Sequence, residues 1–271
     1  MRIKANCKIN IGLDLLARRA DGYHELSTVM VPIYGLYDDI EVERVISGVE
    51  FRSLGVKIDC ADDDNLCVRA SRLMQRCYDI GGVSIALDKR VPFGAGLGGG
   101  SSDATAVIMA INDLYELNLS ESELIARAAE IGSDTPFFVR NTPQLCTSRG
   151  EKMEEIDLNL KGYKIALIKP DIHISTREAF SGVRPSVPEV ELRRLISMPV
   201  AEWQGRVKND FELHLFKLYP ELDRTKCALI DAGAIYASMS GSGSTIYGIF
   251  EGDKKIEGEQ IASYSPLIYN F

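Results

Sequence analysis

The stretch from Pro92 to Thr105 constrains this chain more than any other part of the sequence. Five of the nine residues from Gly94 to Ser102 are glycine, and glycine lets a backbone adopt positive φ and approach a ligand closely. Apolar residues then recur at helical spacing from Ala104 to Leu117. A glycine loop that leads into a helix directs free N–H groups and a positive dipole end at one place, so the expected ligand is a phosphate group.

Other readings of the loop leave part of this stretch unexplained. Gly94, Gly96 and Gly99 have the spacing of a dinucleotide-binding loop, but two helical patterns fill the interval in which its second strand and acidic residue should follow. A Walker loop requires lysine where Gly100 stands. A plain surface turn does not require so many glycines beside a helix start.

Outside the loop, the sequence predicts a mixture of strands and helices. The predicted strands include residues 2–16, 40–45, 49–51, 83–91, 137–139, 163–168, 235–238 and 246–250. The predicted helices include residues 65–80, 120–131, 189–196, 210–218 and 220–232. We expect a domain boundary between Asn141 and Leu160, where a proline turn and a run of charged residues intervene.

Three polar features stand out among these elements. Lys8 and Asn10 lie on one face of the first strand, opposite its apolar residues. Asp134 lies in a junction loop before Pro136, where it is either a turn former or a rigidly held reactive acid. Residues 239–245, Met-Ser-Gly-Ser-Gly-Ser-Thr, form either a simple hairpin turn or a second loop that donates hydrogen bonds to a phosphate.

The composition limits the partners and the compartment. A net charge of −8 and a pI near 5.1 argue against a nucleic-acid surface, and no run of 18 apolar residues predicts a membrane span. Six cysteines without a C-x-x-C pair, and only three histidines, predict no zinc site. We therefore expect buried free thiols in a soluble, cytoplasmic protein with no nucleic-acid or membrane partner.

Three motifs together resemble the GHMP kinase family over the full length of the chain. They are residues 8–13 with 21–26, residues 92–105, and residues 239–248; residues 132–138 also resemble the family's segment that carries the catalytic aspartate. The resemblance implies a two-domain α+β fold. Its N-terminal domain, residues 1–155, would be ribosomal-protein-S5-like α/β with a left-handed crossover, and its C-terminal domain, residues 156–271, would be ferredoxin-like.

Within the family, the pairing of residues 8–10 with residues 21–24 resembles the branch that acts on a cytidine-diphosphate-linked methylerythritol. The resemblance implies transfer of the γ-phosphoryl group of ATP to the 2-hydroxyl of that small molecule, with Asp134 as the base and Lys8 as its charge partner. Substrate contacts are implied for Asn10, which would orient the substrate, and for Tyr23, His24 and Phe180, which would hold the cytosine.

The nucleotide site is also implied by the resemblance. Asn65 and Lys89 would lie near the adenine, although Asn65 could equally be a helix cap. The phosphates would be surrounded by Pro92, Phe93, Gly94, Ala95, Gly96, Leu97, Gly98, Gly99, Gly100, Ser101 and Ser102. Mg²⁺ would accompany ATP without a set of protein metal ligands. Asp103 is expected only to complement the helix dipole.

Two alternative functions are kept open by the same motifs. Another GHMP kinase, of the mevalonate or homoserine type, would keep the glycine loop and lose pyrimidine recognition, and the Tyr23-His24 pair argues against it. A nucleotide-binding relative without catalytic activity would keep the glycines and lose the acid or the lysine, yet Asp134 and Lys8 are both present.

Overall fold

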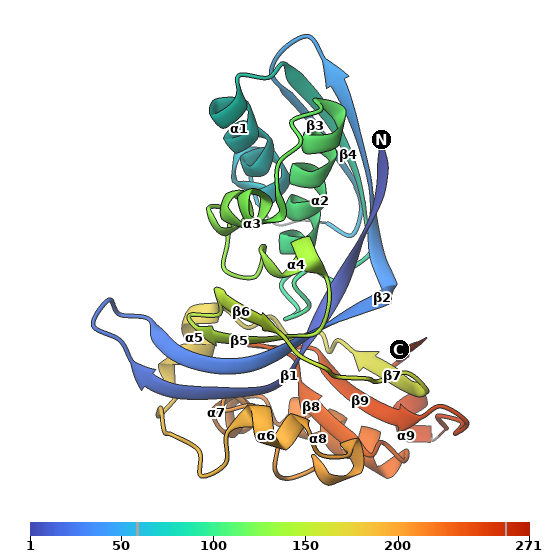
Figure 1. The fold of residues 1–271 in the computed structure, drawn as a ribbon. Helices are drawn as coiled ribbons and strands as arrows, with labels where there is room; N and C mark the ends of the chain where they lie inside the picture. Colours follow the sequence, from blue (N-terminus) through green and yellow to red (C-terminus); the bar gives the residue numbers. More distant parts are fainter. Residues whose placement is uncertain (58–59, 258) are drawn as a thin grey trace. The chain divides into compact units, whose positions relative to one another are not determined.

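The computed structural model describes residues 1–57, 60–257 and 259–271 (Figure 1). The chain forms two compact units, each assembled from separate segments. Unit 1 comprises residues 1–8, 36–93 and 98–142, and unit 2 comprises residues 9–35, 94–97 and 143–271. Each unit combines segments from both sides of residue 155, so this division does not test the domain boundary expected there. That boundary stays a prediction.

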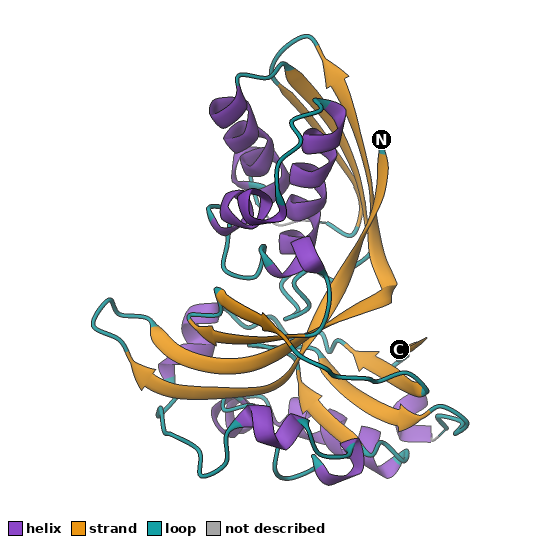
Figure 2. Cartoon of the chain, in the orientation of Figure 1, coloured by secondary structure: helices purple, strands orange, loops and turns teal. Residues whose placement is uncertain are grey.

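Unit 1 is a sheet with helices packed on one face (Figure 2). Its sheet contains β3 (Val49–Gly55), β4 (Gly82–Lys89) and the second half of the long strand β2 (His24–Val45), with β4 parallel to β3 and antiparallel to β2. The helices are α1 (Leu66–Tyr78), α2 (Gly99–Leu114), α3 (Glu121–Ala129) and α4 (Phe137–Arg140). The buried apolar face of α2, including Val107 and Ile108, belongs to a core shared with α1 and the strands. The left-handed crossover stays a prediction.

The local sequence explains where these helices begin and end. Asn65 caps α1, accepting a hydrogen bond from the N–H of Cys67 at 2.9 Å, and Ser120 with Glu123 forms the capping box of α3. Both predicted helix starts are confirmed. The first helix ends earlier than expected, because Asp79 adopts a left-handed conformation with φ of 48° and stops it at Tyr78.

The strand predicted for residues 137–139 is wrong, because these residues form the short helix α4. Pro136 holds a helical φ of −60° at its start, and Asn141 ends it in a left-handed conformation with φ of 55°. Phe137 is fully buried. Three consecutive apolar residues suit a buried helix as well as a strand, and here the proline and the asparagine decide.

Unit 2 contains an antiparallel sheet in the order β10 (Leu267–Asn270), β7 (Tyr163–Ile168), β9 (Ile246–Glu251) and β8 (Tyr236–Met239). The hairpin of β1 (Arg2–Arg18) and β2 also belongs here over residues 9–35, and β5 (Gln144–Ser148) and β6 (Lys152–Glu155) extend it. The helices are α5 (Thr176–Ser181), α6 (Leu192–Ile196), α7 (Glu212–Leu218), α8 (Pro220–Asp231) and α9 (Glu259–Ala262). Short 3₁₀ helices cover residues 62–64 in unit 1 and 200–202 in unit 2.

Two expectations about burial need correction. The sequence predicts a half-buried first strand, but every residue from Ala5 to Leu13 is buried, and exposed residues occur only toward the ends of the strand. All six cysteines are free thiols as expected, yet only Cys7, Cys67 and Cys146 are buried, and the other three are exposed. Among the described residues, no helix is both long and apolar enough to cross a membrane.

Candidate active site

The glycine loop leads directly into α2, as the sequence predicts. Gly98 precedes the helix in a left-handed conformation with φ of 67°, and α2 begins at Gly99, before the serines. The first N–H groups of a helix have no carbonyl partner within it, so this loop carries donors suited to an anion. A Cβ on Gly98 would lie 2.9 Å from Cε of Lys8, which shows how closely the lysine side chain approaches this backbone.

The loop at residues 239–245 holds the glycine loop by hydrogen bonds within unit 2. The Ser240 hydroxyl donates to the carbonyl oxygen of Gly96 at 2.8 Å, and the N–H of Thr245 donates to the carbonyl oxygen of Ala95 at 3.2 Å. A Cβ on Gly96 would lie 2.1 Å from the Ser240 carbonyl oxygen, and Gly96 has a φ of 76°. The segment is a hairpin loop between β8 and β9, as one of the two alternatives predicts, and two of its donors bond to the glycine loop. A role in binding phosphate stays a prediction.

Two residues that support this loop were not singled out from the sequence. The Asn209 amide, which is buried, donates to the carbonyl oxygens of Met239 and Gly241, both at 2.8 Å. The Tyr247 hydroxyl donates to the carbonyl oxygen of Asn10 at 2.9 Å. No local pattern identifies either residue, because their partners are distant in the sequence.

Lys8 and Asp134 form an ion pair in unit 1, with Nζ and Oδ2 separated by 3.2 Å. The lysine side chain is 4% exposed and the aspartate side chain 33%, so a buried cation supports a carboxylate that ligands can reach. Because it is buried, the Lys8 side chain is not solvated, as most strand lysines are.

The loop that carries Asp134 is fixed on both sides. The Asp134 carbonyl oxygen accepts from the N–H of Phe137 at 3.2 Å, and the next residue's carbonyl, that of Thr135, accepts from the Thr105 hydroxyl on α2 at 2.7 Å. The junction is therefore more than a flexible turn beside a proline. It holds one carboxylate at a defined place relative to α2.

Asn10 lies two residues after Lys8 on β1 and is buried. Its side-chain amide donates to the hydroxyl of Thr28 at 3.1 Å, and that hydroxyl donates to the Gly12 carbonyl at 2.6 Å. The N–H of Asn10 donates to Ser240 Oγ at 3.1 Å. Both the backbone and the side chain of Asn10 are therefore held in one orientation.

Lys89 is buried within a cluster of charges. Its ammonium group donates to Asp103 Oδ2 at 2.7 Å and also to Asp38, and Asp38 Oδ1 accepts from the N–H groups of Arg90 and Val91. Burial raises the pKa of Asp103 to about 8, with Lys89 opposing the rise. Burial lowers the pKa of Lys89, but the two carboxylates together raise it above its ordinary value.

This cluster changes the roles assigned to two residues. Asp103 is the fifth residue of α2 and outside its first turn, so the simple dipole role expected for it is wrong. A Cβ on Gly99 would lie 2.9 Å from Nζ of Lys89, which places the ammonium group directly beneath the loop backbone. The ammonium group donates to two carboxylates, and a role of Lys89 near the adenine stays a prediction.

Asn65 lines a cavity of about 320 Å³ in unit 1. Apolar and charged side chains both line it, among them Phe51, Leu54, Lys57 and Asp62. A planar base requires apolar faces and a few hydrogen-bonding groups, and this lining offers both. The helix-cap role of Asn65 is confirmed, and its role in adenine binding stays a prediction.

The residues expected to hold cytosine lie in unit 2, and two of them are in contact. The rings of His24 and Phe180 stack with centroids 4.9 Å apart and an interplanar angle of 26°. Burial, followed by the charge of Arg18, lowers the pKa of His24, so its imidazole is neutral near pH 7. A neutral imidazole has one donor and one acceptor for a base edge.

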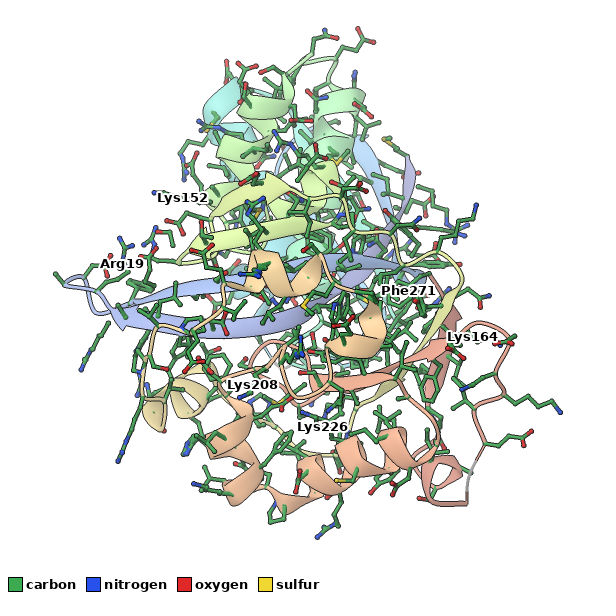
Figure 3. The ribbon with its side chains drawn as sticks, turned by 60° about the horizontal axis from the view of Figure 1, so that its bottom comes forward. Arg19, Lys152, Lys164, Lys208, Lys226 and Phe271 are labelled. Atoms are coloured by element: carbon green, nitrogen blue, oxygen red, sulfur yellow. The ribbon has the colours of Figure 1, made fainter. Side chains whose placement is uncertain are left out.

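Tyr23 is more loosely held at the turn between β1 and β2. It is 58% exposed, and the Arg149 guanidinium lies 5.1 Å from its ring centroid. Arg19, labelled at the end of this hairpin in Figure 3, donates to Glu25 at 2.7 Å and to the Ser148 hydroxyl at 3.0 Å. The turn is anchored by these bonds, while the Tyr23 ring stays accessible.

The donors and shape of the loop suit a nucleoside triphosphate. The first N–H groups of α2 have no carbonyl partner within the helix, and the Lys8 side chain lies against Gly98. Among the residues that the structure describes, no group of three or more His, Cys, Asp or Glu side chains could hold a metal ion. Mg²⁺ usually binds through substrate phosphates, water and one or two carboxylates, so it would be held chiefly by ATP.

This loop, the Lys8–Asp134 pair and the two-domain α+β architecture define a small-molecule kinase. The sequence profile described as GHMP kinases N terminal domain matches residues 65–141, and that described as GHMP kinases C terminal matches residues 196–264. The chain belongs to the GHMP kinase family, which uses ATP as its phosphate donor.

Within the family, the similarity is to one particular enzyme. Proteins named 4-diphosphocytidyl-2-C-methyl-D-erythritol kinase are 43% identical in Parabacteroides distasonis, covering 91% of this chain and 90% of the relative, and 42% identical in Azobacteroides pseudotrichonymphae, covering 98% of both. A crystal structure of 4-(cytidine 5'-diphospho)-2C-methyl-D-erythritol kinase has a TM-score of 0.81 at 34% identity, covering 93% of this chain and 91% of that one. A mevalonate kinase structure, at 16% identity and a TM-score of 0.74, shares the fold.

Proposed function

We propose that this chain transfers the γ-phosphoryl group of ATP to the 2-hydroxyl of 4-diphosphocytidyl-2-C-methyl-D-erythritol. The products are the 2-phosphate of that substrate and ADP, in the synthesis of isoprenoid precursors. The proposal is supported by the relatives that carry this activity in their names and by the Lys8–Asp134 ion pair. The ion pair is the observation that carries it, because it provides an accessible base with a fixed cation.

In the proposed reaction, Asp134 accepts the proton of the 2-hydroxyl as its oxygen bonds to the γ-phosphorus. The bond from that phosphorus to the β–γ bridging oxygen breaks, and ADP leaves with the electron pair. Lys8 would stabilise the carboxylate and the negative charge on the transferring group. Phosphoryl transfer depends mainly on positioning and charge neutralisation, which a fixed pair and a backbone cradle supply.

We assign the loop from Pro92 to Ser102 to the phosphates and Asn65 to the adenine. Asn10 would orient the substrate, and Tyr23, His24 and Phe180 would hold its cytosine. The neutral state of His24 supports this assignment, because only a neutral imidazole can accept a hydrogen bond from the cytosine amino group. Mg²⁺ would arrive with ATP and neutralise phosphate charge. A cytoplasmic location stays a prediction.

The test is the formation of ADP in a coupled assay with three candidate acceptors: the cytidyl substrate, mevalonate and homoserine. We expect turnover with the first and at most background with the other two. The stacked His24–Phe180 pair favours a base-bearing substrate over the other two. Equal turnover of mevalonate would overturn the substrate assignment, and binding of ATP without turnover of any acceptor would favour a relative without catalytic activity.

A further inference from the structure

Phe180 lies on a helix that cannot fix its own orientation. The helix α5 has only six residues, and isolated helices of that length are unstable in water. Local bonds are few: the Ser175 hydroxyl accepts from the N–H of Glu178 at 3.2 Å, and the Ser181 hydroxyl donates to the Glu178 carbonyl at 2.7 Å. Contacts with other parts of unit 2 must therefore set the direction of the Phe180 ring.

One such contact is a hydrogen bond from the corner between α7 and α8. The Tyr219 hydroxyl donates to Glu178 Oε1 at 2.6 Å. Tyr219 is the residue between these two helices, and its own N–H is bonded to the Leu215 carbonyl at 2.7 Å. Its hydrogen bond to Glu178 raises the pKa of Tyr219, so the hydroxyl stays protonated and can donate at neutral pH.

Two further contacts tie α5 to α7. The Phe211 ring meets the Phe180 ring edge to face, with centroids 4.9 Å apart and planes at 85°. At the end of α5, a Cβ on Gly182 would lie 2.1 Å from Nδ1 of His214, so only glycine lets the helix end rest on that ring. Phe180 is thus in contact with two rings, perpendicular to Phe211 and stacked on His24, and the Tyr219–Glu178 bond fixes the preceding turn.

We propose that Tyr219 and Glu178 are positioning residues that set the orientation of Phe180 against His24 and thereby determine the affinity for the base of the substrate. Neither residue needs to touch that substrate. The predicted effect on substrate affinity rests on the proposed function, whereas the predicted effect on the orientation of Phe180 rests on the structure alone.

The kinetic test compares two variants that each lose one phenol hydroxyl. Tyr219→Phe removes the bond to Glu178, while Tyr115→Phe removes a bond of similar length, 2.7 Å, to the Gly82 carbonyl in unit 1. We expect Tyr219→Phe to raise the KM for the cytidyl substrate roughly threefold to tenfold and to leave kcat and the KM for ATP within about twofold. Tyr115→Phe should leave the KM for the cytidyl substrate unchanged.

Variants of Glu178 separate positioning from general stability. Glu178→Gln keeps an oxygen that accepts from Tyr219 and should keep the KM close to the wild-type value, whereas Glu178→Ala should match Tyr219→Phe. The Tyr219→Phe/Glu178→Ala double variant should be no worse than either single variant. The proposal would be overturned if Tyr219→Phe lowered the melting temperature and left the KM for the cytidyl substrate unchanged. It would also be overturned if the variant raised the KM for ATP as much as the KM for the cytidyl substrate.

A second measurement needs no substrate and no activity. The chain has three histidines, so the imidazole Hε1 proton of His24 can be identified by NMR from its loss in His24→Gln. Stacking on Phe180 gives this proton a ring-current shift, which Tyr219→Phe should change and Tyr115→Phe should not. If the wild type fails to turn over the cytidyl substrate, the proposed function is wrong, and this shift still decides whether Tyr219 positions Phe180.

Discussion

The two parts of the molecule that carry the proposed chemistry are held in different ways. In unit 1, Lys8 lies in the middle of a buried strand and Asp134 is in a loop bonded to α2, so the ion pair is supported by the core. In unit 2, His24 begins a strand after an exposed turn and Phe180 lies on a six-residue helix, so the aromatic pair is supported by side chains. The ion pair therefore depends on the core of unit 1, and the aromatic pair depends on a few side-chain contacts in unit 2.

This difference predicts where a mutation acts. Damage to the ion pair should reduce kcat, because the positions of the base and the cation matter in the transition state. Damage to the aromatic pair should raise the KM for the base-bearing substrate and leave the chemical step largely intact. The following predictions test that division, beginning with the largest expected effect.

Asp134→Asn removes the proposed base and keeps the size of the side chain. We expect kcat to fall by roughly 10²- to 10⁴-fold, while the affinity for ATP changes by no more than a few-fold. Steady-state kinetics and calorimetry with an ATP analogue measure the two quantities. An unchanged kcat would show that Asp134 is not the base. It would also contradict the expectation that damage to the ion pair acts on kcat and damage to the aromatic pair acts on KM.

Phe180→Ala and His24→Ala test the aromatic half. Loss of the Phe180 ring should weaken cytidyl and uridyl substrates by a similar factor, on the order of 1 to 3 kcal/mol in kcat/KM, because stacking does not distinguish bases. Loss of His24 should narrow the preference for cytidyl over uridyl, because edge contacts do distinguish them. Equal losses for the two bases in His24→Ala would mean that His24 only supports Phe180.

Gly96→Ala tests whether the loop at residues 239–245 sets the shape of the glycine loop, which is proposed to bind the phosphates of ATP. The new Cβ would meet the Ser240 carbonyl at 2.1 Å, and the left-handed φ adds about 1 to 2 kcal/mol of strain, so we expect the KM for ATP to rise about tenfold or more. Gly205→Ala is the matched control, with a similar φ of 80° and nothing within 4 Å of its Cβ. It should lose a little stability and keep the KM for ATP; equal kinetic effects in both variants would mean that strain alone is responsible.

Asp103→Asn should have the smallest effect on turnover, within about twofold in kcat, since Asp103 has no proposed part in the chemistry. Its effect on stability should depend on pH. The folded-state pKa of Asp103, about 8, exceeds the ordinary value of 3.8, so the folded state holds a proton that the unfolded state releases between these values. This group's contribution to stability is therefore fully present below about pH 4 and is lost as the pH rises through 8.

Denaturant unfolding of the wild type and Asp103→Asn at several pH values checks this dependence. The difference in unfolding free energy between them should change with pH between about 4 and 8 and become constant above that window. Burial lowers the pKa of Lys89, but Asp103 and Asp38 raise it above its ordinary value of 10.5, so Lys89 does not contribute in this window. A difference that is constant across the whole range would show that Asp103 is ionised in the folded protein.

Much of this protein is determined by local sequence. The glycine loop, the caps at Asn65 and Ser120 and the strand at residues 163–168 depend on neighbouring residues, because turns, caps and periodicity act over a few positions. Local patterns do not predict that Lys8 and Asp134 lie close together, because the two residues are far apart in the sequence; only the family resemblance predicts it. The same resemblance predicts a shared role for His24 and Phe180.

The tertiary structure decided what depends on burial and on distant partners. It made residues 137–140 a helix, buried the first strand on both faces, and enclosed the Lys89 ammonium between Asp38 and Asp103. It also joined Ser240 to Gly96 and Tyr219 to Glu178. A sequence pattern records which side chains are polar, but the desolvation and hydrogen-bond partners that give them a role exist only once the chain has folded.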